Sequence, residues 1–404
     1  MTRLLGIQTV AAALAAALSV GAPAARHPCP GDRSLGVFAY LTPHALRVVD
    51  LGTCRSRVVL AGRLSGPIRF SPSGRWIAFG TGVVGVGGAP RFRGSGVWAP
   101  HTDVLARATP RGGLIVAAPG RPTRRLLPDG WGVTGVVWAP TGRSLFVGRS
   151  LFRPPTPQGA RAYRQQLWRI DLGSRRARPL YRQPDRLWAP PLVAESSPDS
   201  RSLFFFRDPM NSASLAADGL PLLVVSARRG GSPRLVVDAL LTGDDFRASC
   251  GQRLVVAAGG GRSTTENKRL VAIAAPAWRP RALASSGALS WISPSCSGDG
   301  LLLAAAGGRV QHGTRFGDEH RSIWLPGSRR RLTTPPAGAT DELPRWSIDN
   351  RILFIRTRRG AGALYLVTTG GETSGPLARV GAAQNYYGHY SWSEQTDWWR
   401  RGSD

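Results

Sequence analysis

The sequence predicts an all-β protein, a seven-bladed β-propeller with six blades as the alternative. Three observations lead to this prediction. First, 50 glycines and 32 prolines are spread along the 404 residues, as expected for many short strands joined by turns. Second, a turn motif recurs at intervals of about 46 to 68 residues, the range of propeller blades with loop insertions. Third, the two ends of the chain each supply part of one blade.

The recurring motif is an aromatic residue, a turn resembling Ser-Pro-Asp-Gly, and a short apolar strand. Its marker positions are Ser71, Ala139, Ser197, Ser249, Ser295, Ser347 and Ser393. The prolines that preset the first corner of a type I turn are Pro72, Pro140 and Pro198. Gly74 and Gly142 supply the left-handed residue of the turn, which Asn350 tolerates well and Ser200 less well. Asp199 and Asp349 are expected to hydrogen-bond to the backbone of their own turns.

Two further strand candidates follow most copies, for example residues 167–172 and 177–181, which gives about four strands per unit. This pattern resembles the TolB-like propeller repeat, a relative of WD-repeat blades, over roughly residues 36–400. The resemblance implies a non-enzymatic platform for protein interactions in the cell envelope.

The chain ends predict a closed ring. Strand candidates at 37–40, 46–51 and 56–60 form a blade that lacks its opening strand, and residues 386–399 provide one. A C-terminal strand that completes the first blade removes open sheet edges. If residues 386–399 only cap the fold, six blades result.

The N-terminus is typical of a secretory signal. Arg3 precedes an apolar stretch at residues 10–20, and Ala22-Pro23-Ala24 fits a cleavage site. We therefore predict a signal peptide at 1–24, an N-terminal segment at 25–35 and one propeller domain at 36–400. The protein is expected to be a secreted or extracytoplasmic monomer with no membrane span after signal removal.

Four cysteines in an exported chain favour two disulfides over a metal site. Of the three possible pairings we favour Cys29 with Cys54 and Cys250 with Cys296. The second pair occupies the turn-proline position in consecutive copies, and the first would hold the N-terminal segment against the closing blade.

The formal net charge of +29 comes almost entirely from arginine, because Lys268 is the only lysine. This imbalance is typical of a GC-rich genome, and export argues against nucleic acid as a partner. A binder of anionic envelope polymers remains a third functional hypothesis, testable by its salt dependence.

No catalytic, cofactor or metal site is predicted, and the chain is expected not to be an enzyme. Residues 80–85 match G-x-G-x-x-G, but the helix that a dinucleotide site requires does not follow. A G-x-S-x-G nucleophile motif does not occur. His312, His320 and the acids at 318–319 resemble metal ligands most closely, yet a solvated loop is favoured.

Partner contact is expected on two long insertions, residues 81–112 and 151–166. Arg91, Arg93 and Trp98 are the proposed anchors, because arginine and tryptophan dominate binding hot spots. The partner would be an envelope protein or polymer. The aromatic tail at 386–399 is read as packing of the closing strand rather than as a sugar platform. The alternative function is a glycan-binding or glycan-active propeller that uses carboxylates at the channel mouth.

Overall fold

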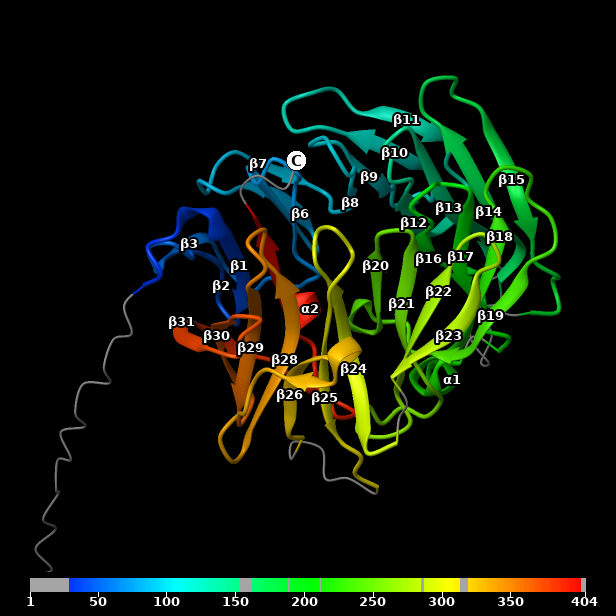
Figure 1. The fold of residues 1–404 in the computed structure, drawn as a ribbon. Coiled ribbons are helices and arrows are strands. Elements are labelled where there is room, and N and C mark those ends of the chain that lie inside the picture. The colour runs from blue at the N-terminus through cyan, green and yellow to red at the C-terminus, as the bar shows by residue number, and fades with distance from the viewer. Residues whose placement is uncertain are drawn as a thin grey trace, which may run out of the picture.

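A computed structural model describes residues 29–152, 162–187, 189–210, 212–284, 287–312 and 319–400. It contains eight four-stranded antiparallel sheets, which follow one another around a ring, and one two-stranded hairpin (Figure 1). The all-β propeller is confirmed, but the prediction of seven blades, with six as the alternative, is wrong because the ring has eight. The predicted signal peptide at 1–24 lies outside the described residues.

Each of blades 2 to 8 is a meander of four consecutive strands, and blade 1 takes one strand from the C-terminus. Blade 1 comprises β34 (Thr396–Trp399), β1 (Val37–Thr42), β2 (Ala45–Asp50) and β3 (Arg55–Ala61). Blade 2 comprises β4 (Arg69–Phe70), β5 (Trp76–Phe79), β6 (Gly82–Gly85) and β7 (Arg91–Arg93). Blade 3 comprises β8 (Val97–Trp98), β9 (Leu105–Ala108), β10 (Leu114–Ala117) and β11 (Arg124–Leu127). Blade 4 comprises β12 (Gly132–Trp138), β13 (Ser144–Phe152), β14 (Ala162–Asp171) and β15 (Ala177–Arg182).

The other four blades follow the same order. Blade 5 comprises β16 (Leu192–Ser196), β17 (Ser202–Phe206), β18 (Leu220–Ser226) and β19 (Arg234–Leu240). Blade 6 comprises β20 (Arg247–Cys250), β21 (Arg253–Ala258), β22 (Arg269–Ala274) and β23 (Arg279–Ala284). Blade 7 comprises β24 (Leu289–Cys296), β25 (Leu303–Arg309), β26 (Arg321–Leu325) and β27 (Arg330–Arg331). Blade 8 comprises β28 (Ala339–Trp346), β29 (Ile352–Arg358), β30 (Ala361–Val367) and β31 (Thr373–Ala382).

Short helices and one hairpin complete the fold. They are α1 (Ala213–Asp218), α2 (Trp392–Gln395), η1 (Arg33–Leu35), η2 (Asp244–Phe246), η3 (Pro326–Ser328), and the hairpin of β32 (Asn385–Tyr386) and β33 (His389–Tyr390). In Figure 1, α2 lies among the innermost strands near the middle of the ring. None of the helices in the described ranges is long and apolar enough to cross a membrane.

The extra blade lies where the sequence predicted a loop insertion at 81–112. These residues form β6 and β7 of blade 2 and β8 and β9 of blade 3. The missed marker is Ala99, since Val97-Trp98-Ala99-Pro100 repeats the tetrapeptide at 137–140. Two small blades therefore fit into the longest interval between predicted markers.

The C-terminal strand closes the ring. β1 pairs with β34 in antiparallel register from Val37 with Trp399 to Tyr40 with Thr396. The pairing covers the edge that β1 would otherwise expose at the start of the ring, where unpaired backbone groups invite aggregation.

Tryptophans at the ends of innermost strands join neighbouring blades. The Nε1 of Trp98 donates to the backbone oxygen of Arg69 at 3.0 Å, from blade 3 to blade 2. Trp138 donates to Val97 at 2.8 Å, and Trp346 donates to Ser295 at 3.0 Å, each to the preceding blade. The predicted aromatic position thus acts as both an apolar wedge and a hydrogen-bond donor.

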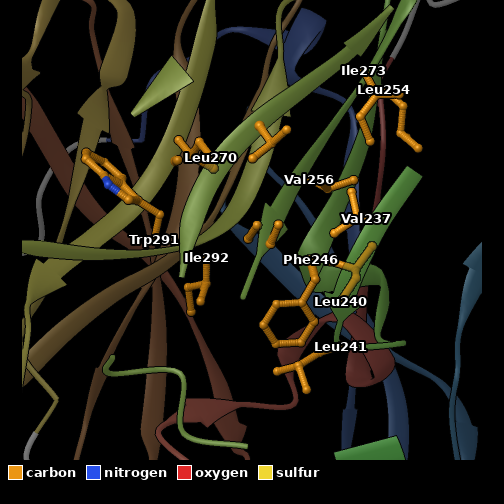
Figure 2. Close-up of a cluster of buried hydrophobic side chains, with 14 of the residues drawn as sticks. Val237, Leu240, Leu241, Phe246, Leu254, Val256, Leu270, Ile273, Trp291 and Ile292 are labelled. Atoms are coloured by element: carbon orange, nitrogen blue, oxygen red, sulfur yellow. The ribbon is translucent and has the colours of Figure 1, made fainter. Parts of the chain in front are cut away.

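The largest apolar cluster extends across blades 5 to 8. Figure 2 shows the part around Phe246, which lies among Leu240 of β19, Val256 of β21 and Ile292 of β24. Strands of three blades and η2 bury these side chains together. Such burial is the main favourable contribution to the stability of the ring.

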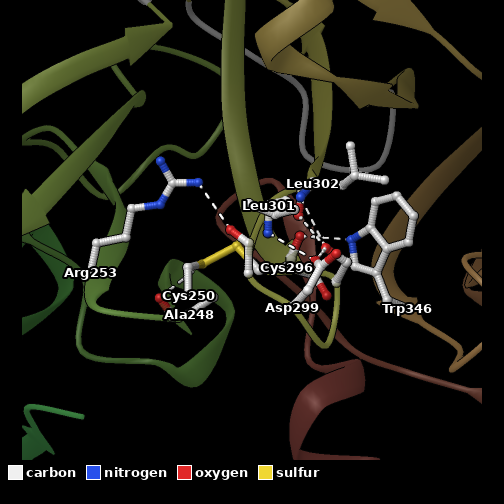
Figure 3. Close-up of a disulfide and its surroundings, with 11 residues drawn as sticks. Ala248, Cys250, Arg253, Cys296, Asp299, Leu301, Leu302 and Trp346 are labelled. Atoms are coloured by element: carbon white, nitrogen blue, oxygen red, sulfur yellow. Dashed lines mark hydrogen bonds between the residues drawn. A yellow bond between two sulfur atoms is a disulfide. The ribbon is translucent and has the colours of Figure 1, made fainter. Parts of the chain in front are cut away.

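Both favoured disulfides are present, Cys29–Cys54 and Cys250–Cys296, with Cα atoms 5.9 and 5.5 Å apart. The predicted position of the second pair is wrong. Cys250 and Cys296 end the innermost strands β20 and β24, where four of the other six blades carry a tryptophan, and the turn of blade 7 begins at Ser297 instead of Ser295. Figure 3 shows this disulfide beside Trp346.

The blade turns have the backbone that the motif requires. The φ angles of Gly74, Gly142, Ser200 and Asn350 are +68°, +67°, +57° and +60°. Asp199 accepts hydrogen bonds from the Ser197 hydroxyl at 2.6 Å and the Arg201 amide at 3.0 Å, within its own turn.

Candidate binding cleft between blades 2 and 3

Blades 2 and 3 meet through a thin interface. Their innermost strands, β4 and β8, have two residues each, and the other strands have three or four. The apolar cluster buried between them consists of Ala78, Val83, Trp98 and Leu105. Because few side chains fill this space, a cleft with two pockets remains.

The first pocket, here named the arginine pocket, has a volume of about 620 Å³. Four arginines line it, and apolar side chains such as Phe92 and Leu105 form much of its wall. The arginines are Arg91, Arg93, Arg107 and Arg121. Among the residues that the structure describes, no acidic side chain lines this pocket.

The structure brings together all three predicted contact residues. Arg91 and Arg93 project from β7 with exposed side chains, and Trp98 lies on β8 and is 9% exposed. All three line the arginine pocket. They belong to two blade sheets rather than to a loop, so regular strands fix their positions.

The second pocket, here named the axial pocket, has a volume of about 1020 Å³. It extends from Asp397 and Arg400, beside the innermost strands, to Trp98 between the blades. Its lining combines indole rings with hydroxyl and charged groups, including Trp76, Trp398, Trp399, Ser73, Arg75, His101 and Asp103.

The two pockets adjoin along a shared wall of Trp98, Ala118, Pro119 and Arg121. Together they form one continuous cleft, with a mixed-charge part along the turns of blades 2 and 3 beside β34 and a cationic part toward the outer strand β7. A volume of this size matches or exceeds that of typical small-ligand sites, about 300 to 1000 Å³.

Several contacts fix the walls of the cleft. Trp399 donates from Nε1 to the Pro72 oxygen at 2.9 Å, so the closing strand supports the axial pocket. The guanidinium of Arg107 lies over Gly94, where a β-carbon would overlap its Nη1 atom. Gly94 has a φ angle of +90°, a conformation that favours glycine, so the residue both shapes the connection and leaves room for Arg107.

Asp103 holds the turn of blade 2 at the rim of the axial pocket. Its Oδ2 accepts from the Ser73 hydroxyl at 2.7 Å, and its Oδ1 accepts from the Ser73 amide at 3.2 Å. Burial acts to raise the pKa of Asp103, but hydrogen bonds from Ser73 and Ser71 keep it below the usual value. Asp103 is therefore ionised, and from the turn of blade 3 it is engaged by the turn of blade 2, which makes it a structural carboxylate.

The carboxylates near the axis are held by arginines and hydroxyls. Asp244 accepts from Arg69 and Arg247, each at 2.6 Å, and these two charges keep its pKa low although burial acts to raise it. Glu195 accepts from the Ser249 hydroxyl at 3.2 Å, and burial raises its pKa against the charge of Arg247.

The chain itself fills part of the ring centre. The hydroxyl of Ser393, within α2, donates to Asp245 at 2.8 Å, and the Tyr390 amide donates to Glu342 at 3.1 Å. Glu342 also accepts from Arg321 at 2.7 Å, and both side chains are buried. Burial lowers the pKa of His389, on β33, to about 3, so this imidazole is neutral. These groups hold the C-terminal segment in place.

The described residues of the other two candidate sites, the histidine cluster and the G-x-G-x-x-G match, do not form a ligand site. His312 contacts Glu266 at 2.9 Å, and His320 contacts the Ala339 oxygen at 2.9 Å, so the two histidines point to different partners. Within the described ranges no group of three potential metal ligands occurs, and residue 318 lies outside them. Residues 80–85 form the turn after β5 and strand β6 rather than the start of a helix.

The aromatic tail divides into two parts. Tyr390 and Trp392 are buried in the core between blades 8 and 1. Trp398 and Trp399 are only half-buried and line the axial pocket. Packing of the closing strand therefore accounts for the first two residues, whereas the last two also contribute to the candidate site.

Sequence reasoning missed Arg107 and Arg121. The repeated Val-Trp-Ala-Pro tetrapeptide would have revealed blade 3 and placed Arg107 on its second strand. The second predicted insertion, 151–166, is mostly the long hairpin of β13 and β14, and residues 153–161 lie outside the described ranges.

None of the known protein-family models matches the chain, and no curated protein matches it. Solved structures with a similar fold include an oligogalacturonate lyase from Vibrio parahaemolyticus, with 10% identity, a TM-score of 0.50, and coverage of 82% of this chain and 98% of that one. TolB from Acinetobacter baumannii shares 16% identity with a TM-score of 0.38, covering 78% and 67% of the two chains.

A Mycobacterium tuberculosis puromycin-hydrolysing peptidase shares 16% identity with a TM-score of 0.48, and the match covers 89% of this chain. This chain spans a little over half the length of that peptidase and of a second puromycin hydrolase, 56% and 57% respectively.

The comparison with the Vibrio parahaemolyticus structure corrects one expectation. That protein has this fold and is a lyase, so the prediction of a non-enzymatic chain is wrong as an inference from the fold. The WD-repeat propellers are a different family from the TolB-like propellers. This chain is an eight-bladed β-propeller, and its resemblance to the TolB-like propellers holds at the level of the fold.

Proposed function

We propose that this protein is an extracytoplasmic β-propeller that binds an extended ligand in the cleft between blades 2 and 3. One observation carries the proposal. Two large pockets adjoin along the wall of Trp98 and Ala118, at an interface whose strands are too short to fill it. A continuous cleft of this kind fits a segment of a chain molecule, such as an envelope polymer or the exposed part of an envelope protein.

The chemistry of the cleft supports recognition. Half-buried indole rings give a flat apolar surface, and guanidinium and hydroxyl groups give directional hydrogen bonds. This combination is typical of ligand sites, in which a mostly apolar wall carries a few placed polar groups.

Two disulfides support the extracytoplasmic location. Cys29–Cys54 and Cys250–Cys296 are both formed, and such bonds persist in oxidising compartments. The first holds the N-terminal segment to blade 1, and the second joins the innermost strands of blades 6 and 7.

The test fills the cleft without removing a contact. Ala118, half-buried on the shared wall, is replaced by tryptophan. The control is Ser174→Trp, which adds an equally large side chain at an exposed position in the corresponding turn of blade 4. Melting temperatures verify that both variants fold.

Binding of a panel of anionic glycans, neutral glycans and envelope-derived peptides is measured by calorimetry. The proposal expects at least one ligand that binds the wild type and Ser174→Trp but not Ala118→Trp. If Ala118→Trp binds every ligand as tightly as the wild type does, the cleft is not the binding site and the proposal fails.

A further inference from the structure

The arginine pocket has a charge pattern that selects its ligand. We propose that it binds an anionic polysaccharide, with acidic groups on the arginines and sugar rings against Trp98 and Phe92. This inference rests on the proposed function and specifies the chemical class of the ligand.

The first argument is charge. The four arginines lie around one hollow of about 620 Å³ that no described acidic side chain lines. None of the four forms an ion pair with a described residue, whereas Arg125, one position beyond β11's first residue, pairs with Asp129. Four like charges around a concave wall repel one another and focus a positive potential into the cleft. An anionic ligand relieves that repulsion.

The second argument is geometry. Arg91 and Arg93 are two positions apart on β7, so both project from the same side of the strand. Phe92, between them, points the other way, stacks edge-on against Trp76 with ring centroids 5.4 Å apart, and still contributes to the pocket wall. The spacing places two guanidinium groups in a row, which suits a ligand with repeated acidic groups.

The third argument is that the site is built into the backbone. Gly94 leaves the space that the Arg107 guanidinium occupies beside the connection between β7 and β8. Arg121 lies in the turn between β10 and β11, where its amide donates to the Ala118 oxygen at 3.0 Å. The cationic wall is therefore assembled from both blades, and β7, a blade edge, leaves it open to a long polymer.

An acidic peptide is the main competing ligand. The walls favour a polysaccharide because, beside aliphatic residues such as Leu105, the apolar lining includes four ring side chains, which match the flat faces of sugar rings: Trp98, Phe92, Pro119 and Pro122. A peptide with acidic side chains would instead need backbone partners, and the strand that lines the pocket, β7, offers three residues.

The experiment measures binding of a short alginate oligomer, a maltooligomer of similar length and poly-glutamate by calorimetry at low and moderate salt. The test variant is Arg91→Gln/Arg93→Gln, on the outer strand of blade 2. The matched control is Arg55→Gln/Arg57→Gln, two exposed arginines with the same spacing on β3, the outer strand of blade 1. Both variants lose the same charge from exposed positions, so both are expected to fold.

We expect alginate to bind more tightly than the neutral maltooligomer and to weaken as salt increases. Its affinity should fall by at least about tenfold in the blade 2 variant, because two charge-assisted hydrogen bonds are lost, and remain unchanged in the control. Ala118→Trp should also abolish alginate binding.

Three results would each overturn the inference. Equal losses in both double variants would show that the net charge, rather than the pocket, attracts alginate. Binding of poly-glutamate as tight as that of alginate, or binding of the maltooligomer that equals it, would assign the pocket to another ligand class. In either of these latter cases a ligand that Ala118→Trp excludes still supports the cleft as a binding site, so the two proposals fail independently.

Discussion

Asp245 offers a direct test of the packing at the ring centre. Its side chain is 6% exposed, its Oδ2 accepts from Ser393 at 2.8 Å, and its Oδ1 has no hydrogen-bond partner among the described residues. Burial raises the pKa of this carboxyl from 3.8 to about 6, against the hydrogen bond from Ser393 and the charge of Arg345. The buried negative charge therefore costs stability at neutral pH.

The direction of the pH effect on stability follows from comparing the folded protein with the unfolded chain. The pKa of the folded protein lies above that of the unfolded chain, so the folded state binds the proton more tightly. The free energy of unfolding should then rise as the pH falls from about 7 through about 6 toward 3.8. The full shift of about two pKa units corresponds to about 3 kcal/mol, of which about 2 kcal/mol is gained by about pH 4.5.

The measurement compares the wild type with Asp245→Asn by urea unfolding at several values between about pH 8 and pH 4.5. Burial lowers the pKa of His389 to about 3, so this residue decreases the free energy of unfolding as the pH falls below about 6.5. Both proteins contain His389, so its effect cancels when the free energy of unfolding of the variant is subtracted from that of the wild type. The wild type should gain about 2 kcal/mol relative to the variant as the pH falls.

Asp299→Asn is the control. Hydrogen bonds from Ser297 and the Leu301 amide keep the pKa of this turn carboxyl below 3.8, so its replacement should give no such gain on acidification. A difference between the wild type and Asp245→Asn that is flat over the same range would refute the burial argument.

Three further predictions concern the ring. Gly142→Ala should cost about 1 kcal/mol for its left-handed backbone, since the nearest atom to the added carbon, in Pro100, is 3.9 Å away. Gly74→Ala, with nearly the same φ angle, should cost more because its β-carbon would overlap the Trp399 ring; equal costs by urea unfolding would contradict this contact. Replacing both Cys250 and Cys296 with alanine should lower the free energy of unfolding by about 4 kcal/mol, from the entropy of a loop closed across 46 residues; an unchanged denaturation midpoint would contradict the estimate. Removing β34 should expose the edge of β1 and cause aggregation, measured by light scattering; a monomer as stable as the full chain would show that ring closure is not required.

The sequence reveals the repeated blade because the turn has strict backbone requirements. A left-handed residue at position 74 or 142 needs glycine, and the aromatic before the turn must fit between two sheets. These two requirements make the turn recognisable in most blades, although the strands around it differ in sequence. The cysteines at 250 and 296 broke the pattern because a disulfide replaces the tryptophan wedge between blades 6 and 7, which shifted the predicted turn by two residues.

The cleft could be predicted only in part. Residue type alone indicates Arg91, Arg93 and Trp98 as contact residues, and it does not show that they meet at one pocket. Arg107 and Arg121 follow later in the chain, and their approach depends on how blade 3 folds back against blade 2. The alternation of apolar and polar residues within one strand does not show how one blade packs against the next.

The missed blade and the cleft have the same physical cause. Strands of two to four residues give too few alternating apolar positions to stand out in the sequence, and they also bury too few side chains to fill the space between two sheets. The ring tolerates this thin interface because the larger cores around blades 5 to 8 and the closing strand hold the blades in place. Because these cores stabilise the ring, the interface between blades 2 and 3 can remain open, and the four arginines that line it form no ion pair with a described residue.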